Sequence, residues 1–168
     1  MLDTHDEFHS FCAALGFVEV NWALFEQNID HWVSIIFGSL GGRAISWEIP
    51  RPFSAKAKFL RRSFNKIPLL HAYTNDATMI LQRADALAQT RNDLMHGVVT
   101  HIRPIRGEYR LSKIDYEKER HVYREVVFAI RAFPKLAQDL VDLGTDAAHL
   151  GLKLLALEAR LRRAGPHR

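Results

Sequence analysis

An arginine, an asparagine and a histidine lie within six residues of one another in the segment TRNDLMHGVV, residues 90–99. The guanidinium of arginine forms a planar fork of donors that suits phosphate, and imidazole exchanges protons near neutral pH. Arg91, Asn92 and His96 would together suit metal-free cleavage of RNA. The 2′-OH would attack the neighbouring phosphorus, His96 would transfer a proton, Arg91 would stabilise the phosphorane, and Asn92 would position the groups. DNA lacks the attacking hydroxyl.

The spacing of these three residues limits how they can meet. On a helix, Arg91 and His96 point about 140° apart, whereas Asn92 and His96 share a face. Arg91 and His96 therefore converge on one ligand only if the helix ends early or if a second copy of the chain faces the first. The spacing alone is not specific, because Arg162 and His167 repeat it across a Gly-Pro pair. A histidine in a last helical turn also stabilises the helix dipole by about 0.3–1 kcal/mol, without any catalysis.

The elements that must position these residues are mostly helical. Apolar residues recur at alternating intervals of three and four, which predicts one long helix with a narrow apolar seam: Phe8, Phe11, Leu15, Val18, Trp22, Phe25, Ile29, Trp32 and Ile36. The segment GSLGGRAISWEIPRP interrupts this pattern, and a short helix is expected at about residues 54–65. Pro68 suits the first turn of the next helix. That helix continues to His96, with Gly97 as its C′ residue.

The residues after the motif change character. Two β-branched runs flank a Pro-to-Gly turn, so a hairpin is expected with strands near residues 98–102 and 109–114. The last third returns to the spacing of three and four, at Val126, Ala129, Phe133, Leu136, Leu140, Leu143, Ala147, Leu150, Leu154 and Leu157. Pro134 is expected to kink this helix, and the segment LGTDAAHL to divide it.

The predicted fold class is therefore all-α: an antiparallel bundle of four or five helices with a small β-hairpin inserted after the motif helix. Residues 1–168 are expected to form a single domain.

The composition is that of a soluble globular protein, with 48% hydrophobic and 25% charged residues among 168. A net charge of +4 and a pI of about 9.4 would help the chain to bind a polyanion. The most apolar stretch, residues 32–40, is too short to cross a bilayer, and the N-terminus MLDTHDEF lacks the basic region of a secretory signal. The lone Cys12 suits a reducing compartment, so a cytoplasmic protein with no membrane partner is expected.

The motif resembles the signature of the HEPN superfamily. Members carry an arginine, usually a polar residue next, and a histidine four to six positions after the arginine, near the end of a helix in an all-α bundle. Arg91, Asn92 and His96 match this signature, and the preceding ADALAQT and the early LGFVEVNWALFE also look similar. In the HEPN branch whose antitoxin is a nucleotidyltransferase, a tyrosine follows two positions after the histidine. Val98 stands there in this chain, which argues against that mode of neutralisation.

The resemblance implies a homodimer in which two Arg–His pairs meet across a two-fold axis. It further implies a metal-independent endoribonuclease that leaves a 2′,3′-cyclic phosphate, with a toxin or antiphage role and an antitoxin or regulatory protein as a possible partner. Other members of the superfamily are inactive and serve as binding modules.

Further basic residues are candidates for RNA binding. Lys58 and Arg62 lie four apart on the short helix and would follow an RNA backbone, or would form an ordinary solvated face. Arg103 and Arg106 at the hairpin turn would reach a bound strand, or would keep the turn soluble.

No cofactor is expected, because no nucleotide-binding fingerprint occurs. No metal is expected either, because His5 and His9 have no evident third ligand.

Three hypotheses remain open on the sequence. The first is an endoribonuclease with RNA as substrate. The second is an inactive HEPN-like module that binds a protein or RNA. The third is a structural helical protein in which the motif is a coincidence.

Overall fold

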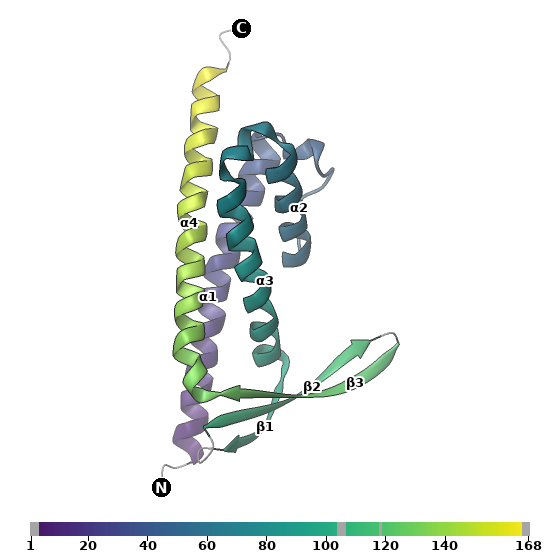
Figure 1. The fold of residues 1–168 in the computed structure, drawn as a ribbon, viewed down its shortest axis with the longest axis vertical. Coiled ribbons are helices and arrows are strands. Elements are labelled where there is room, and N and C mark those ends of the chain that lie inside the picture. The colour runs from purple at the N-terminus through teal and green to yellow at the C-terminus, as the bar shows by residue number, and fades with distance from the viewer. Residues whose placement is uncertain (1–3, 104–106, 118, 166–168) are drawn as a thin grey trace. The chain divides into compact units, whose positions relative to one another are not determined.

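The computed structural model describes residues 4–103, 107–117 and 119–165. Four α-helices account for most of this part of the chain: α1 (Thr4–Ser39), α2 (Phe53–Lys66), α3 (Thr74–His96) and α4 (Phe133–Ala164). Short 3₁₀ turns lie at Gly42–Ala44, Pro68–Tyr73 and Ile130–Ala132. An antiparallel sheet follows α3, in the order β1 (Val98–Arg103), β2 (Glu108–Glu117), β3 (Arg120–Ala129) (Figure 1). A mostly helical fold with a β insertion after α3 is confirmed, but the insertion is a three-stranded sheet rather than the expected hairpin.

The chain divides into two compact units, and α1, α3 and α4 contribute residues to both. Unit 1 comprises Met1–Trp22 and Asp85–Val141, and unit 2 comprises Ala23–Ala84 and Asp142–Arg168. The sheet and the end of α3 belong to unit 1, whereas α2 belongs to unit 2. The Arg-Asn-His motif and the basic residues of α2 are therefore in different units.

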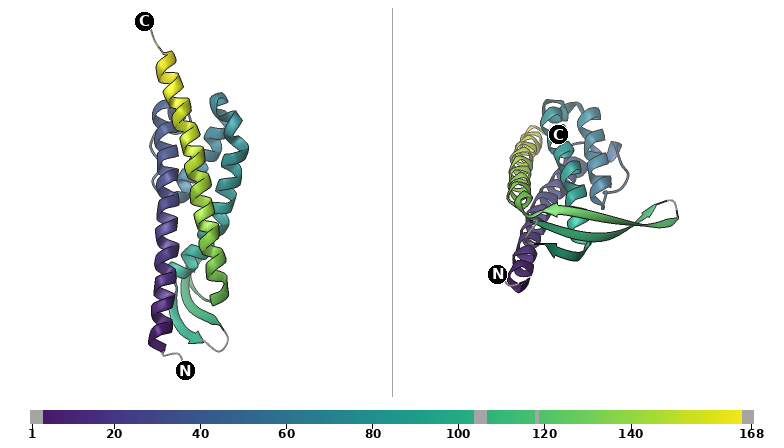
Figure 2. Two further views of the ribbon diagram at one scale, coloured as in Figure 1. Left: turned by 90° about the vertical axis from the view of Figure 1, so that its left-hand side faces the viewer. Right: turned by 60° about the horizontal axis from the view of Figure 1, so that its bottom comes forward.

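The core of unit 2 is built around Trp32 on the seam of α1. Its indole is fully buried and donates a hydrogen bond of 3.0 Å to the carbonyl of Ala147 on α4. A Cβ at Gly151 would lie only 3.2 Å from the indole nitrogen, which explains a small residue at that position. Phe64 of α2 meets the indole edge-on, with ring centroids 6.1 Å apart. These contacts hold α1 and α4 side by side in this unit (Figure 2).

The core of unit 1 lies under the sheet. Tyr109 and Leu111 are alternate residues of β2 and are buried. The rings of Phe11 and Phe133 contact Tyr109, and Phe128 packs against Phe133. Along the same face of β2, the period of two places Lys113 and Asp115 next. One end of this face is therefore apolar and the other end charged.

The transition from α3 into β1 depends on Gly97. The helix ends at His96, as the sequence predicts, but Gly97 does not have the positive φ of a left-handed cap. A Cβ on Gly97 would lie 2.7 Å from the Asp93 carbonyl oxygen and 2.8 Å from the Cβ of Leu111. Glycine is needed here because of close packing between the helix end and β2.

Three expectations for the last third are wrong. Val126 and Ala129 lie in β3 rather than in a helix, because the segment HVYREVV forms a strand paired to β2 along its whole length. Pro134 is the second residue of α4, where the first turn has no intrahelical N–H bond to lose, so it causes no kink. The segment LGTDAAHL does not divide α4, which is helical throughout.

The first helix also differs in detail from its prediction. Most of the seam is buried, but Phe8 is half exposed. By length and composition alone, residues Asp6–Ser39 are apolar enough to cross a bilayer, which is a much longer candidate than the stretch 32–40 considered from the sequence. Core helices of soluble proteins and signal sequences meet the same criterion.

Candidate functional site

The motif residues occupy the final turns of α3. Arg91 and Asn92 are half-buried, whereas His96, the last helical residue, is exposed. The histidine side chain makes no hydrogen bond with any residue that the structure describes. An accessible imidazole at a helix end is able to exchange protons with a ligand or with solvent.

The guanidinium of Arg91 is held by α1. Its Nε donates a 2.9 Å hydrogen bond to Oε2 of Glu19, and its terminal nitrogen pairs with Oε1 of the same carboxylate. The other terminal nitrogen donates to Oδ1 of Asn92, at 3.1 Å. The side chain of Arg91 is 20% exposed and that of Glu19 is 38% exposed, so the pair is open to solvent on one side. This two-pronged geometry is the strong form of an arginine–carboxylate contact.

Asn92 is therefore engaged with Arg91 in this structure. The sequence suggested that Asn92 could orient the imidazole one turn later, but among the described residues the amide contacts the guanidinium instead. Arg91 and Asn92 form one polar pair, and His96 stands apart from them within this chain. This agrees with the 140° separation expected on a helix.

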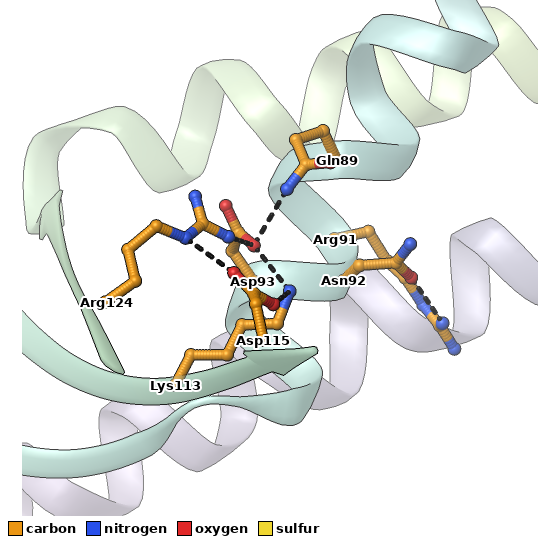
Figure 3. A network of polar contacts seen from close by, with 7 residues as sticks. All are labelled: Gln89, Arg91, Asn92, Asp93, Lys113, Asp115 and Arg124. Atoms are coloured by element: carbon orange, nitrogen blue, oxygen red, sulfur yellow. Dashed lines mark hydrogen bonds and ion pairs between the residues drawn. The ribbon is translucent and has the colours of Figure 1, made fainter. Parts of the chain in front are cut away.

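The next residue, Asp93, points to the opposite side of α3, toward the sheet (Figure 3). It is 8% exposed. Its Oδ1 accepts hydrogen bonds from Lys113 at 3.0 Å, from Gln89 at 2.9 Å and from Arg124. Asp115 accepts a further hydrogen bond from Arg124, at 2.9 Å, and pairs with Lys113 at 3.1 Å. We call Asp93, Lys113, Asp115 and Arg124 the helix–sheet network.

The charges in the helix–sheet network balance. Lys113 and Arg124 stand directly opposite each other on β2 and β3, an arrangement of like charges that destabilises a sheet unless carboxylates lie between them. Burial raises the pKa of Asp93, but the hydrogen bonds from Lys113, Arg124 and Gln89 outweigh burial and bring the pKa below its ordinary value. The hydrogen bond that Lys113 donates to Asp93 likewise raises the pKa of Lys113. The network therefore fixes the last turns of α3 against the sheet in a fully ionised state.

The end of α3 is thus anchored on two sides, through two residues that lie two positions apart. Arg91 is bound to α1 through Glu19, and Asp93 is bound to β2 and β3. These contacts position the helix end from which His96 projects. Glu19 and Asp93 were not among the predicted site residues. The available signal for Asp93 was Lys113 near the end of the predicted strand 109–114, with Asp115 two residues later.

None of the four residues predicted to bind RNA can be placed beside the motif: two belong to the other unit, and the side chains of the other two lie outside the described residues. Lys58 and Arg62 are exposed on α2, in unit 2. Their neighbour Lys56 is buried and pairs with Glu26 and Asp30, so it is not available to a ligand. The side chain of Arg103 and all of Arg106 lie outside the described residues.

Known proteins give no independent assignment of this site. No protein-family model matches the chain, and no curated protein and no solved structure matches it significantly.

Proposed function

We propose that the chain is a metal-independent endoribonuclease that uses His96, Arg91 and Asn92. The observation that carries the proposal is an exposed imidazole at the end of α3, on a helix that also holds a guanidinium and an amide half-buried against Glu19. The resemblance of the motif to the HEPN signature supports the same assignment.

The reaction would be an internal transesterification of RNA. The 2′-oxygen forms a bond to the adjacent phosphorus, and the bond from phosphorus to the 5′-oxygen breaks, leaving a 2′,3′-cyclic phosphate and a 5′-hydroxyl. His96 transfers one of the two protons involved, and Arg91 stabilises the negative charge on the phosphorane oxygens. For this, a phosphate oxygen must compete with Glu19 for part of the guanidinium fork. Asn92 holds the third nitrogen of that fork in place.

The proposed active form is a homodimer. Because Arg91 and His96 diverge on α3, a second copy is needed to bring an imidazole from one subunit near a guanidinium of the other. Two histidines at a shared site would also provide both a general base and a general acid. A toxin or antiphage role, with an antitoxin or regulatory protein as partner, is the setting that the HEPN resemblance suggests.

The test is cleavage of end-labelled RNA by the purified chain in excess EDTA. We expect cleavage by the wild type, and a loss of at least 100-fold for His96→Ala, as for removal of a general acid or base. His31→Ala is the matched control, because His31 is also an exposed helical histidine, and it should cleave at the wild-type rate. Cleavage that survives in His96→Ala would refute the proposal.

A second candidate is a non-catalytic module that binds RNA. It is favoured by the pairing of Arg91 with Glu19, which occupies two of the three guanidinium nitrogens. RNA binding by the wild type without any cleavage in EDTA would support this alternative.

A further inference from the structure

A cavity of about 410 Å³ lies between the segment of residues 45–52 and helix α2, entirely within unit 2. Its lining combines apolar and cationic side chains, among them Ile49, Arg51, Pro52, Lys58, Phe59 and Arg62. We call it the α2 cleft. Its volume falls in the range of ordinary ligand sites.

The cationic side chains of the α2 cleft have no acidic partner among the described residues. The side chains of Arg51, Lys58 and Arg62 are all exposed, and none of these side chains makes an ion pair or hydrogen bond with any residue in the described part of the chain. Only one carboxylate, Glu48, is among the lining residues. By contrast, Lys56 on the same helix is neutralised by two acids. The cleft therefore presents excess positive charge to solvent, which favours an anionic ligand.

An exposed tryptophan lies next in sequence to residues that line the same cleft. Trp47 lies between the lining residues Ser46 and Glu48 and is 87% exposed. A solvent-exposed indole offers a flat apolar face on which a base can stack, and such stacking contributes regardless of base identity. The prolines at positions 50 and 52 restrict the backbone that carries it.

We propose that the α2 cleft binds a segment of single-stranded RNA, with its phosphates on Arg51, Lys58 and Arg62 and a base stacked on Trp47. Lys58 and Arg62 are one helical turn apart, about 6 Å along the axis, so they can contact more than one phosphate of a strand. An acidic peptide would use the same cations but would gain little from the indole. The inference rests on the proposed function only in taking RNA as the ligand, and it concerns a separate unit of the chain.

Quenching of tryptophan fluorescence reports whether Trp47 is covered by a ligand. Trp22 and Trp32 are buried, at 4% and 0% exposure, so a neutral quencher such as acrylamide acts mainly on Trp47. The protein is the full chain carrying His96→Ala, which keeps the RNA intact, and the probe is a 12-nucleotide oligouridylate. We expect the oligonucleotide to protect Trp47 from acrylamide, and the protection to be absent in a further Trp47→Phe variant.

The salt dependence of binding tests the cations. Each phosphate contact to a single strand contributes a slope of about 0.7 in log K against log salt. The double variant Lys58→Gln/Arg62→Gln should therefore lower the slope by about 1.4 and weaken binding at least fivefold at low salt. Arg160→Gln removes a comparably exposed cation of α4, which does not line the cleft, and should bind as the parent does.

The outcomes separate the two proposals. Protection of Trp47 with the expected change of slope supports the α2 cleft, even if the wild type cleaves no RNA in EDTA. Binding that leaves Trp47 open to quencher, or that falls equally in Arg160→Gln, overturns it. Absence of any oligonucleotide binding also overturns it, and an acidic protein partner would then be the occupant to test.

Discussion

Replacement of Asp93 by asparagine should destabilise unit 1 far more than its small change of shape suggests. Asparagine retains an oxygen that can accept from Gln89, but it removes one of the two negative charges that separate Lys113 from Arg124. The helix–sheet network would then hold two cations and one carboxylate.

The magnitude follows from the burial and number of these contacts. Breaking a buried ion pair by removing one partner costs about 3–5 kcal/mol. Asp93 and Lys113 are largely buried, with side chains 11% and 14% exposed, but Arg124 is 40% exposed and keeps part of its hydration. We therefore expect a loss of about 2–3 kcal/mol, which for a chain of this length lowers Tm by about 4–12 °C.

Urea unfolding at pH 7 measures this loss, with Asp139→Asn as the control. Asp139 forms a solvent-exposed ion pair with Lys135 on the same helix. Its replacement should change the free energy of unfolding by no more than about 0.5 kcal/mol. A loss for Asp93→Asn that is no larger than the control would refute the reasoning.

The pH dependence gives a second test of the same variant. Because the pKa of Asp93 is lowered on folding, its contribution is complete above its ordinary value of 3.8 and is lost as the pH falls through the lowered pKa. The stability gap between wild type and Asp93→Asn should therefore be constant from neutral pH to about pH 5 and close below pH 4. A gap that widens in acid would contradict the assignment.

Three further predictions concern the packing around the site and the core, all measurable by urea or thermal unfolding. Gly97→Ala should cost about 1–3 kcal/mol because its Cβ would overlap backbone and Leu111, whereas Gly144→Ala, in open space on α4, should add up to about 1 kcal/mol. Glu19→Gln should cost about 1 kcal/mol by removing the charged partner of Arg91. Trp32→Phe should cost about 2–3 kcal/mol, since it removes the buried hydrogen bond to the Ala147 carbonyl and leaves a void.

Much of the helical framework could be predicted from the sequence, because apolar spacing alone determines it. The seam around Trp32 is buried as expected, and α2 extends only one residue beyond its predicted range at each end. The third strand could not be found in the same way. Val126 and Ala129 fit the helical spacing that continues from Phe133, but pairing with β2 decides their conformation. A local spacing of apolar residues does not indicate which distant strand a segment pairs with.

In the candidate site, too, local features could be predicted from the sequence and long-range contacts could not. The position of Arg91, Asn92 and His96 at a helix end followed from local pattern. The partner of Arg91 is Glu19, 72 residues earlier in the chain, and no local spacing links the two. Recognising the contacts of Asp93 required the register of two strands, since its cationic partners are 20 and 31 residues away.

The central claim is that His96 and Arg91 promote attack by a 2′-hydroxyl without a metal. The most direct measurement uses an oligodeoxynucleotide containing a single ribonucleotide, incubated with the chain in EDTA and analysed by mass spectrometry. We expect one cut, immediately 3′ of the ribonucleotide, with a 2′,3′-cyclic phosphate on one product and a 5′-hydroxyl on the other, and no cut by His96→Ala. Cutting at deoxynucleotides, a linear phosphate formed directly, or equal cutting by His96→Ala would contradict it.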